Sequence, residues 1–194
     1  LGVWLFCGEH CCGKKTLMKE FTRAYFNQEE MIELDVSMID VSLHPVMNKI
    51  KRNPYTTVHV ANLHCASPTT LSLLRCSILK GFMEVSDQRV DLRHSIFIMS
   101  GEFTLPAQDS LHFFETQTYQ TMLEKQLGKE FMEIFDDIFL FDSLKESDKL
   151  SVLRRETQNW RHAPDELTLI NACRQSDTVE HALKQLRSGV MHTM

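Results

Sequence analysis

A short apolar run that ends in a glycine-rich loop is the feature that most constrains the fold of this chain. Residues 2–7 (GVWLFC) are apolar, residues 8–15 (GEHCCGKK) follow the pattern G-x-x-x-x-G-K, and residues 14–25 carry apolar side chains at helical spacing. A strand, a glycine loop and a helix in this order present backbone N–H groups and a helix N-terminus, which attract phosphate oxygens. The sequence therefore predicts a phosphate-binding loop after a buried strand.

This predicted phosphate loop supplies the candidate nucleotide-binding residues. They are Gly8, Glu9, His10, Cys11, Cys12, Gly13, Lys14 and Lys15. Lys14 would reach the β- and γ-phosphates, but the next position normally holds a Ser or Thr whose hydroxyl helps to hold Mg²⁺. Lys15 stands there instead, and Thr16 is rotated by about 100° around the helix. We expect ATP or ADP to bind without Mg²⁺; the alternative is a glycine turn that binds nothing.

Further apolar segments indicate a parallel sheet. Strands are predicted at residues 31–36, 56–60, 95–99 and 138–141, and a helix that begins at Ser67-Pro68 ends at Gly81. Alternating strands and helices predict an α/β fold whose parallel sheet has helices on both faces. Residues 103–120 read as a long loop, and helical segments follow at 147–160 and 177–186. We predict an α/β subdomain over residues 1–144, truncated at its N-terminus, and a small helical subdomain over 145–194.

Composition narrows the classes of function. Apolar residues make up 43% of the chain and charged residues 24%, as in ordinary globular proteins. The formal charge of −5 argues against nucleic-acid binding through bulk positive charge. We find neither a transmembrane run nor a signal peptide, and the six cysteines lack the spacing of a disulfide scaffold. The expectation is an intracellular protein, in cytoplasm or nucleus, that binds neither membranes nor nucleic acid.

Several later segments match one family in order. Residues 54–68 (PYTTVHVANLHCASP) align without a gap to P-Y-S-V-V-L-L-D-E-I-E-K-A-H-P, and residues 90–93 (VDLR), 95–100 (SIFIMS) and 136–144 (DDIFLFDSL) follow. The chain thus resembles the Clp-type AAA+ ATPases, a family of unfoldases and disaggregases, from Val3 to about Leu153. The resemblance implies an AAA+ phosphate-loop fold with a helical lid, protein partners, and assembly into homo- or hetero-oligomers.

The resemblance also shows where the chain departs from the family. Ala61 aligns with the aspartate that positions Mg²⁺, Asn62 with the glutamate that activates water, Glu102 with the sensor 1 asparagine, and Ile134 with the arginine finger. Alanine cannot ligate a metal, and a neutral amide cannot act as a general base. The sensor 2 arginine should lie near Asp177, where Arg174 is a substitute. An aromatic pore loop is missing between Asp35 and Pro54.

These losses predict a pseudo-ATPase without catalytic residues, which acts as a scaffold or a regulatory protein-interaction module. One alternative is a weakly active chaperone-type ATPase completed by a partner subunit, and it requires a carboxylate that reaches Asn62. The other is a Clp-related transcriptional repressor of plant strigolactone and karrikin signalling, which residues 4–8 and 13–15 resemble.

Other groups of polar residues suggest weaker sites. Zinc ligands are conceivable among His10, Cys11, Cys12, His64 and Cys65, but C-x₂₋₄-C spacing is lacking, so we expect no metal. A cysteine nucleophile could pair with His64, since cysteines at a helix N-terminus have a lowered pKa. An acidic rim (Glu9, Glu102, Asp109) and a basic stripe (Lys149, Arg154, Arg155, Arg161) are expected to be solvated surface.

Overall fold

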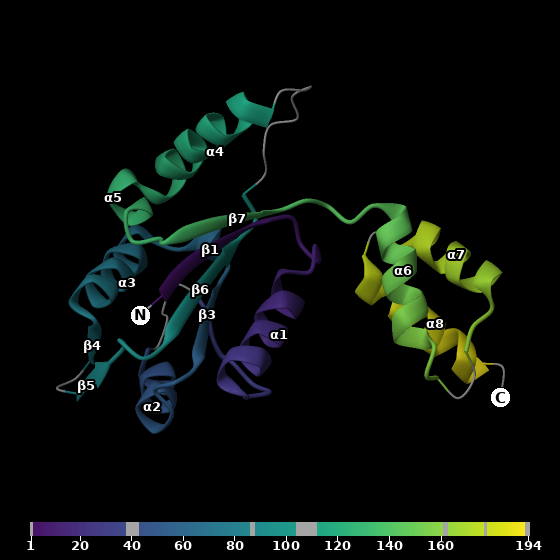
Figure 1. The fold of residues 1–194 in the computed structure, drawn as a ribbon, viewed down its shortest axis with the longest axis horizontal. Coiled ribbons are helices and arrows are strands. Elements are labelled where there is room, and N and C mark those ends of the chain that lie inside the picture. Colours follow the sequence, from purple (N-terminus) through teal and green to yellow (C-terminus); the bar gives the residue numbers. More distant parts are fainter. Residues whose placement is uncertain are drawn as a thin grey trace. The chain divides into compact units, whose positions relative to one another are not determined.

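A computed structural model describes residues 2–37, 43–85, 88–103, 112–160, 163–176 and 178–192. The chain divides into two compact units, Leu1–Phe141 and Asp142–Met194. Figure 1 colours them from purple to green and from green to yellow. In the described part of the chain, no helix has the length and apolar character needed to cross a membrane.

The first unit is built on a five-stranded parallel sheet. Its strands are β1 (Gly2–Gly8), β2 (Ile32–Asp35), β3 (Thr57–Ala61), β6 (Ile96–Gly101) and β7 (Asp137–Phe141). They lie in the order β2-β3-β6-β1-β7, and every neighbouring pair is parallel. A separate antiparallel pair joins β4 (Phe82–Val85) and β5 (Gln88–Asp91). The predicted α/β class is therefore confirmed.

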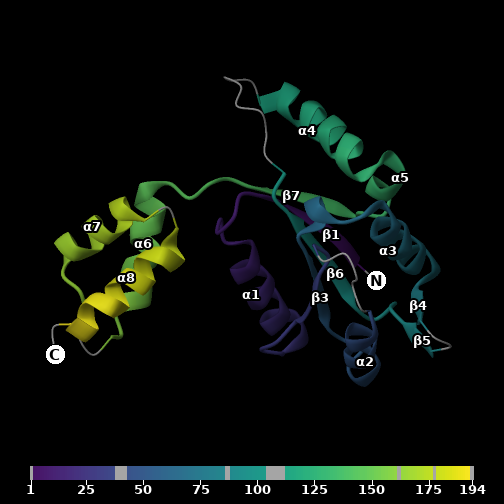
Figure 2. The ribbon, with the colours of Figure 1, turned by 180° about the vertical axis from the view of Figure 1, so that it is seen from behind.

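Helices cover both faces of this sheet, as Figures 1 and 2 show from opposite sides. One face packs on α1 (Lys14–Phe26), where Met18 meets Phe6 and Ile98 in a buried cluster. The other face carries α2 (His44–Arg52), α3 (Pro68–Lys80), α4 (His112–Leu127) and α5 (Lys129–Met132). Alternate strand residues such as Leu5 and Phe97 form the larger core with these helices. This alternation is the expected result of the period-two direction of strand side chains.

Local sequence signals set the ends of α3. The Ser67 hydroxyl accepts a hydrogen bond from the Thr70 N–H at 3.1 Å, which caps the first turn, and Pro68 occupies that turn. Gly81 ends the helix in the left-handed conformation with φ 71°. Both predicted ends are confirmed.

The predicted loop over residues 103–120 is wrong in its second half, because α4 begins at His112. Tyr119, Leu123 and Leu127 recur every four residues and are buried in the core. Packing against the rest of the unit stabilises a helix whose many threonine and glutamine residues hide its apolar face in the sequence.

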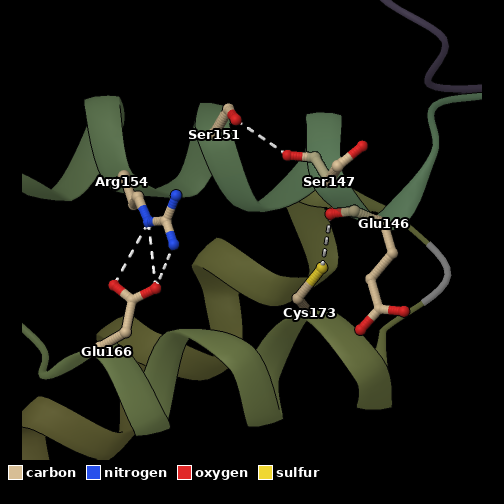
Figure 3. A network of polar contacts seen from close by, with 6 residues as sticks. All are labelled: Glu146, Ser147, Ser151, Arg154, Glu166 and Cys173. Atoms are coloured by element: carbon tan, nitrogen blue, oxygen red, sulfur yellow. Dashed lines mark hydrogen bonds and ion pairs between the residues drawn. The ribbon is translucent and has the colours of Figure 1, made fainter.

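The second unit consists of α6 (Glu146–Thr157), α7 (Glu166–Gln175) and α8 (Val179–His192). Their shared core is Leu153, Leu169, Ala172, Cys173, Ala182 and Leu186. Figure 3 shows polar contacts between α6 and α7: the Arg154 guanidinium pairs with the Glu166 carboxylate, and the Cys173 thiol donates to the Glu146 carbonyl at 3.6 Å. Arg154 of the predicted basic stripe is thus an interhelical ion-pair partner, while Arg161 lies outside the described residues.

Candidate functional site

The carboxyl ends of the parallel strands bring the sequence-predicted site residues to one edge of the sheet. Gly8 ends β1, Ala61 ends β3, and Glu102 follows β6. In open α/β sheets this edge is where ligands bind, at the helix N-termini. The candidate site is therefore assembled around the loop between β1 and α1.

Backbone geometry explains the glycines of the phosphate loop. Gly8 has φ +149°, and a Cβ there would lie 2.4 Å from the Phe141 carbonyl oxygen. Gly13 has φ +95° and stands at the N-cap of α1, with nothing within 4 Å of an added Cβ. The loop is thus closely packed where it leaves β1 and open where α1 begins, which leaves the helix N-terminus accessible to an anion.

Lys14 is folded back onto its own loop. Its ammonium donates to the Gly8 carbonyl at 2.8 Å, to the Glu9 carbonyl at 2.6 Å, and to the Cys12 sulfur at 3.4 Å. An ammonium has three N–H donors, so these contacts use all of them. A bound phosphate must therefore replace at least one of these contacts, and the weak thiol acceptor is the easiest to give up.

Lys15 forms an ion pair that the sequence analysis missed. Its Nζ lies 2.9 Å from a carboxylate oxygen of Glu33 on β2, and both side chains are about half exposed. Glu33 and Asp35 alternate on β2, so both belong to the same face of the strand. This alternation could have indicated in the sequence that the two carboxylates share a face. It could not have indicated that Lys15 of α1 is the partner of Glu33.

Asn62 is held by a carboxylate from the neighbouring strand. Its amide Nδ2 donates to both oxygens of Asp35, each at 3.0 Å. Asp35 also accepts from the Ser37 N–H at 2.9 Å and from the Ser37 hydroxyl at 2.7 Å. These hydrogen bonds, first those from Ser37 and then that from Asn62, lower the pKa of Asp35. Asp35 is therefore an ionised carboxylate whose acceptor positions are largely used, and a poor proton acceptor.

Glu102 and Ile134 are the other two positions at which the sequence differs from the family it resembles, and the structure describes both. The Glu102 side chain is exposed, and its backbone N–H donates to His64 Nδ1 at 3.1 Å. Ile134 is 7% exposed and belongs to the main core. The Ile134 side chain therefore fills the core, and it has no charged group that could reach a neighbouring molecule.

Comparison with known proteins identifies the fold. No family profile matches the chain. Over 86% of its length the chain is 22% identical to the chaperone proteins ClpB of Lactococcus lactis subsp. cremoris and of L. lactis subsp. lactis. The structure of the S. cerevisiae Hsp104–ADP complex superposes on 99% of the chain with a TM-score of 0.80 and 15% identity. The chain folds as a Clp-type AAA+ module.

A second solved structure gives the same result for this AAA+ module. The closed state of Hsp104 with ATPγS and FITC-casein covers 98% of the chain with a TM-score of 0.75 and 17% identity. The module spans 22% of the length of each ClpB and 40% of each Hsp104 chain.

Two expected groups fit this AAA+ site differently. The open N-terminus of α1 and the Lys14 ammonium suit the phosphates of a nucleotide. Mg²⁺ does not fit, because the Ala61 methyl offers no ligand and the Lys15 ammonium, paired with Glu33, stands at the position of the hydroxyl ligand.

The thiols and imidazoles expected near the site do not gather into a metal centre. Among the described residues, no three His, Cys, Asp or Glu side chains are close enough together to hold an ion. Cys11 Sγ lies 2.8 Å from His10 Nδ1, whereas Cys12 Sγ contacts Lys14. Asp109 of the predicted acidic rim lies outside the described residues. Arg174, the candidate sensor 2 residue, has its Nε 3.0 Å from a carboxylate oxygen of Glu146 within the helical unit.

A buried histidine beneath α1 was not anticipated. His59 on β3 is 5% exposed, its Nε2 lies 2.8 Å from the Ser100 hydroxyl, and its Nδ1 has no partner among the described residues. Burial lowers the pKa of His59 from 6.5 to about 4, although the nearby Glu33 carboxylate opposes this shift. The imidazole is therefore neutral at pH 7.

His59 should make the module less stable in mild acid. In the unfolded chain the imidazole takes up a proton as the pH falls below 6.5, but in the folded chain only near pH 4. Protonation in this window favours unfolding, so the contribution of His59 at pH 4.5 falls by about 2 kcal/mol relative to pH 7. Urea unfolding of wild type and His59→Gln at both pH values measures this. The variant should lose about 2 kcal/mol less, and an equal loss would exclude a neutral buried imidazole.

Proposed function

We propose that this Clp-type AAA+ module is a pseudo-ATPase: it binds ATP or ADP through its phosphate loop, does not hydrolyse ATP at ordinary rates, and serves as a scaffold or regulatory protein-interaction module. The observation that carries the proposal is the Lys15–Glu33 ion pair, at 2.9 Å, in the position where the family has a metal ligand. A fixed ammonium supplies positive charge beside the phosphates. It cannot supply the bridging coordination that Mg²⁺ provides.

The alternative of a weakly active ATPase depends on a carboxylate near Asn62. Asp35 does reach that position, since both of its oxygens lie 3.0 Å from Asn62 Nδ2. A general base, however, needs a free acceptor and a pKa near the working pH. The hydrogen bonds from Ser37 and Asn62 lower the pKa of Asp35 instead. The geometry therefore favours a structural role for Asp35 and supports the degenerate site.

Protein partners are the second half of the proposal. One similar solved structure is Hsp104 with FITC-casein, a protein ligand. In the present module, Leu79 on α3 is 61% exposed and Leu167 on α7 is 69% exposed. Exposed apolar side chains of this size are consistent with binding of protein surfaces, in homo- or hetero-oligomers. The net charge of −5 gives no reason to propose nucleic acid.

Nucleotide binding can be tested by thermal unfolding with ATP or ADP, each with Mg²⁺ and with EDTA. A ligand at 100 times its Kd stabilises the folded state by about 2.7 kcal/mol, or several degrees in Tm. We expect the same shift with and without Mg²⁺, and its loss in Lys14→Ala. Lys19→Ala is the matched control, because Lys19 is an exposed lysine on the same helix. An unchanged Tm at millimolar nucleotide, or an equal shift in Lys14→Ala, would contradict binding by the loop.

A further inference from the structure

The phosphate loop contains a thiol and an imidazole in direct contact. Cys11 Sγ lies 2.8 Å from His10 Nδ1, at a residue in the left-handed conformation with φ 59°. Cys11 is partly exposed and His10 is exposed. A cysteine within hydrogen-bond reach of a histidine is the arrangement that activates a thiol, because the imidazole accepts the thiol proton.

Cys11 also precedes the N-terminus of a helix. The helix α1 begins at Lys14, three residues further along the chain, and the N-terminal end of a helix favours negative charge. The Lys14 and Lys15 ammonium groups have other partners, because Lys14 contacts Gly8, Glu9 and Cys12 and Lys15 pairs with Glu33.

The other cysteines provide comparisons within the same chain. His64-Cys65 is a second His–Cys pair, but there His64 Nδ1 accepts the Glu102 N–H at 3.1 Å, and Cys65 is exposed. Cys7 is buried, and burial raises its pKa to about 12, so that thiol is inert at neutral pH. Cys76 is exposed on α3. Exposure alone therefore does not distinguish Cys11, whereas its contact with His10 does.

We propose that Cys11 is a redox modification site, which exchanges with low-molecular-weight disulfides and thereby closes the phosphate loop to nucleotide. His10 takes the Cys11 proton, and the thiolate attacks one sulfur of the disulfide. The S–S bond of the reagent breaks, a mixed disulfide forms on Cys11, and the departing thiolate takes the proton from the imidazolium. Cys11 is oxidised and half of the reagent is reduced to a thiol.

The effect on nucleotide rests on the proposed function. A glutathionyl group carries two carboxylates and one ammonium, so its attachment adds net negative charge to the loop. That charge repels phosphate, and the added group occupies space beside the N-terminus of α1. Reduction by excess thiol should reverse both effects.

The test uses glutathione disulfide at pH 7, with adducts located by peptide mass spectrometry over time. Cys11 should react at least about tenfold faster than Cys65 and Cys76. His10→Gln should bring Cys11 to the rate of Cys65 at pH 7, and the difference should vanish above about pH 9, where free thiols ionise unaided. The wild-type pH–rate profile is a second measurement that needs no variant: the rate advantage of Cys11 over Cys65 should be largest near pH 7 and smallest above about pH 9. Equal rates, coincident profiles, or no effect of His10→Gln would overturn the proposal.

Thermal unfolding of the modified protein distinguishes the redox proposal for Cys11 from the proposal that the loop binds nucleotide. The ATP-induced shift in Tm should be present before modification, lost in the Cys11 adduct, and restored by reduction. An ATP-induced Tm shift of full size in the Cys11 adduct would overturn the proposal that modification of Cys11 prevents nucleotide binding. Absence of a shift in unmodified protein would instead contradict nucleotide binding itself, while the reactivity of Cys11 is still decided by mass spectrometry.

Discussion

A chain carrying both Lys15→Thr and Ala61→Asp is expected to bind ATP about a hundredfold more tightly with Mg²⁺ than with EDTA. Mutation of a residue that only supports a metal ligand typically lowers metal affinity by about 10–100-fold, and a residue that binds the metal directly should count for at least as much. The first change supplies a hydroxyl at the N-terminal turn of α1, and the second places a carboxylate at the end of β3, where hard oxygen ligands suit Mg²⁺. In the wild type, the two affinities should agree within about threefold. Isothermal titration under both conditions measures the difference.

The single variants are the matched controls. In Ala61→Asp the carboxylate is present but the hydroxyl is not, and Lys15 keeps its 2.9 Å ion pair with Glu33. In Lys15→Thr the hydroxyl is present but the carboxylate is not, and Glu33 is released from its 2.9 Å ion pair. We expect at most a small Mg²⁺ effect in either. A wild type that already requires Mg²⁺, or a double variant that remains indifferent to it, would contradict this account of the metal position.

The parts of the fold that were predictable are those governed by local sequence. The glycines at 8 and 13, the Ser67-Pro68 helix start and the Gly81 stop all act on the backbone within a few residues. Buried parallel strands appear as apolar runs, which made the sheet recognisable. By contrast, α4 was missed because its buried residues, Tyr119, Leu123 and Leu127, are separated mostly by polar ones and are stabilised by distant partners.

The candidate site shows the same division. The sequence identifies what is lost, since Ala61 and Asn62 align with charged residues in the resembled family. It does not identify the polar contacts that form in the site instead. Lys15 and Glu33 are 18 residues apart in the sequence, and Asp35 and Asn62 are 27 residues apart. Contacts over such separations form only when the sheet brings β2 next to β3, and the order β2-β3-β6-β1-β7 is known from the structure.

ATP hydrolysis should be almost absent in this module. In the proposed alignment the buried Ile134 replaces the arginine finger, whose loss alone is worth about 10³–10⁵ in rate. In the proposed alignment the Asn62 amide stands in place of the general base, which contributes a further factor of about 10²–10⁴. With typical enzymes turning over at about 10 s⁻¹, these losses place the rate below about 10⁻³ s⁻¹.

Phosphate release from ATP by the purified chain, compared with Lys14→Ala at the same concentration and with Mg²⁺ present, tests the central claim most directly. The account predicts equal, background-level release from both proteins, together with the Lys14-dependent thermal shift described above. Lys14-dependent release at about 1 s⁻¹ or faster, within the range of ordinary enzymes, would contradict a pseudo-ATPase.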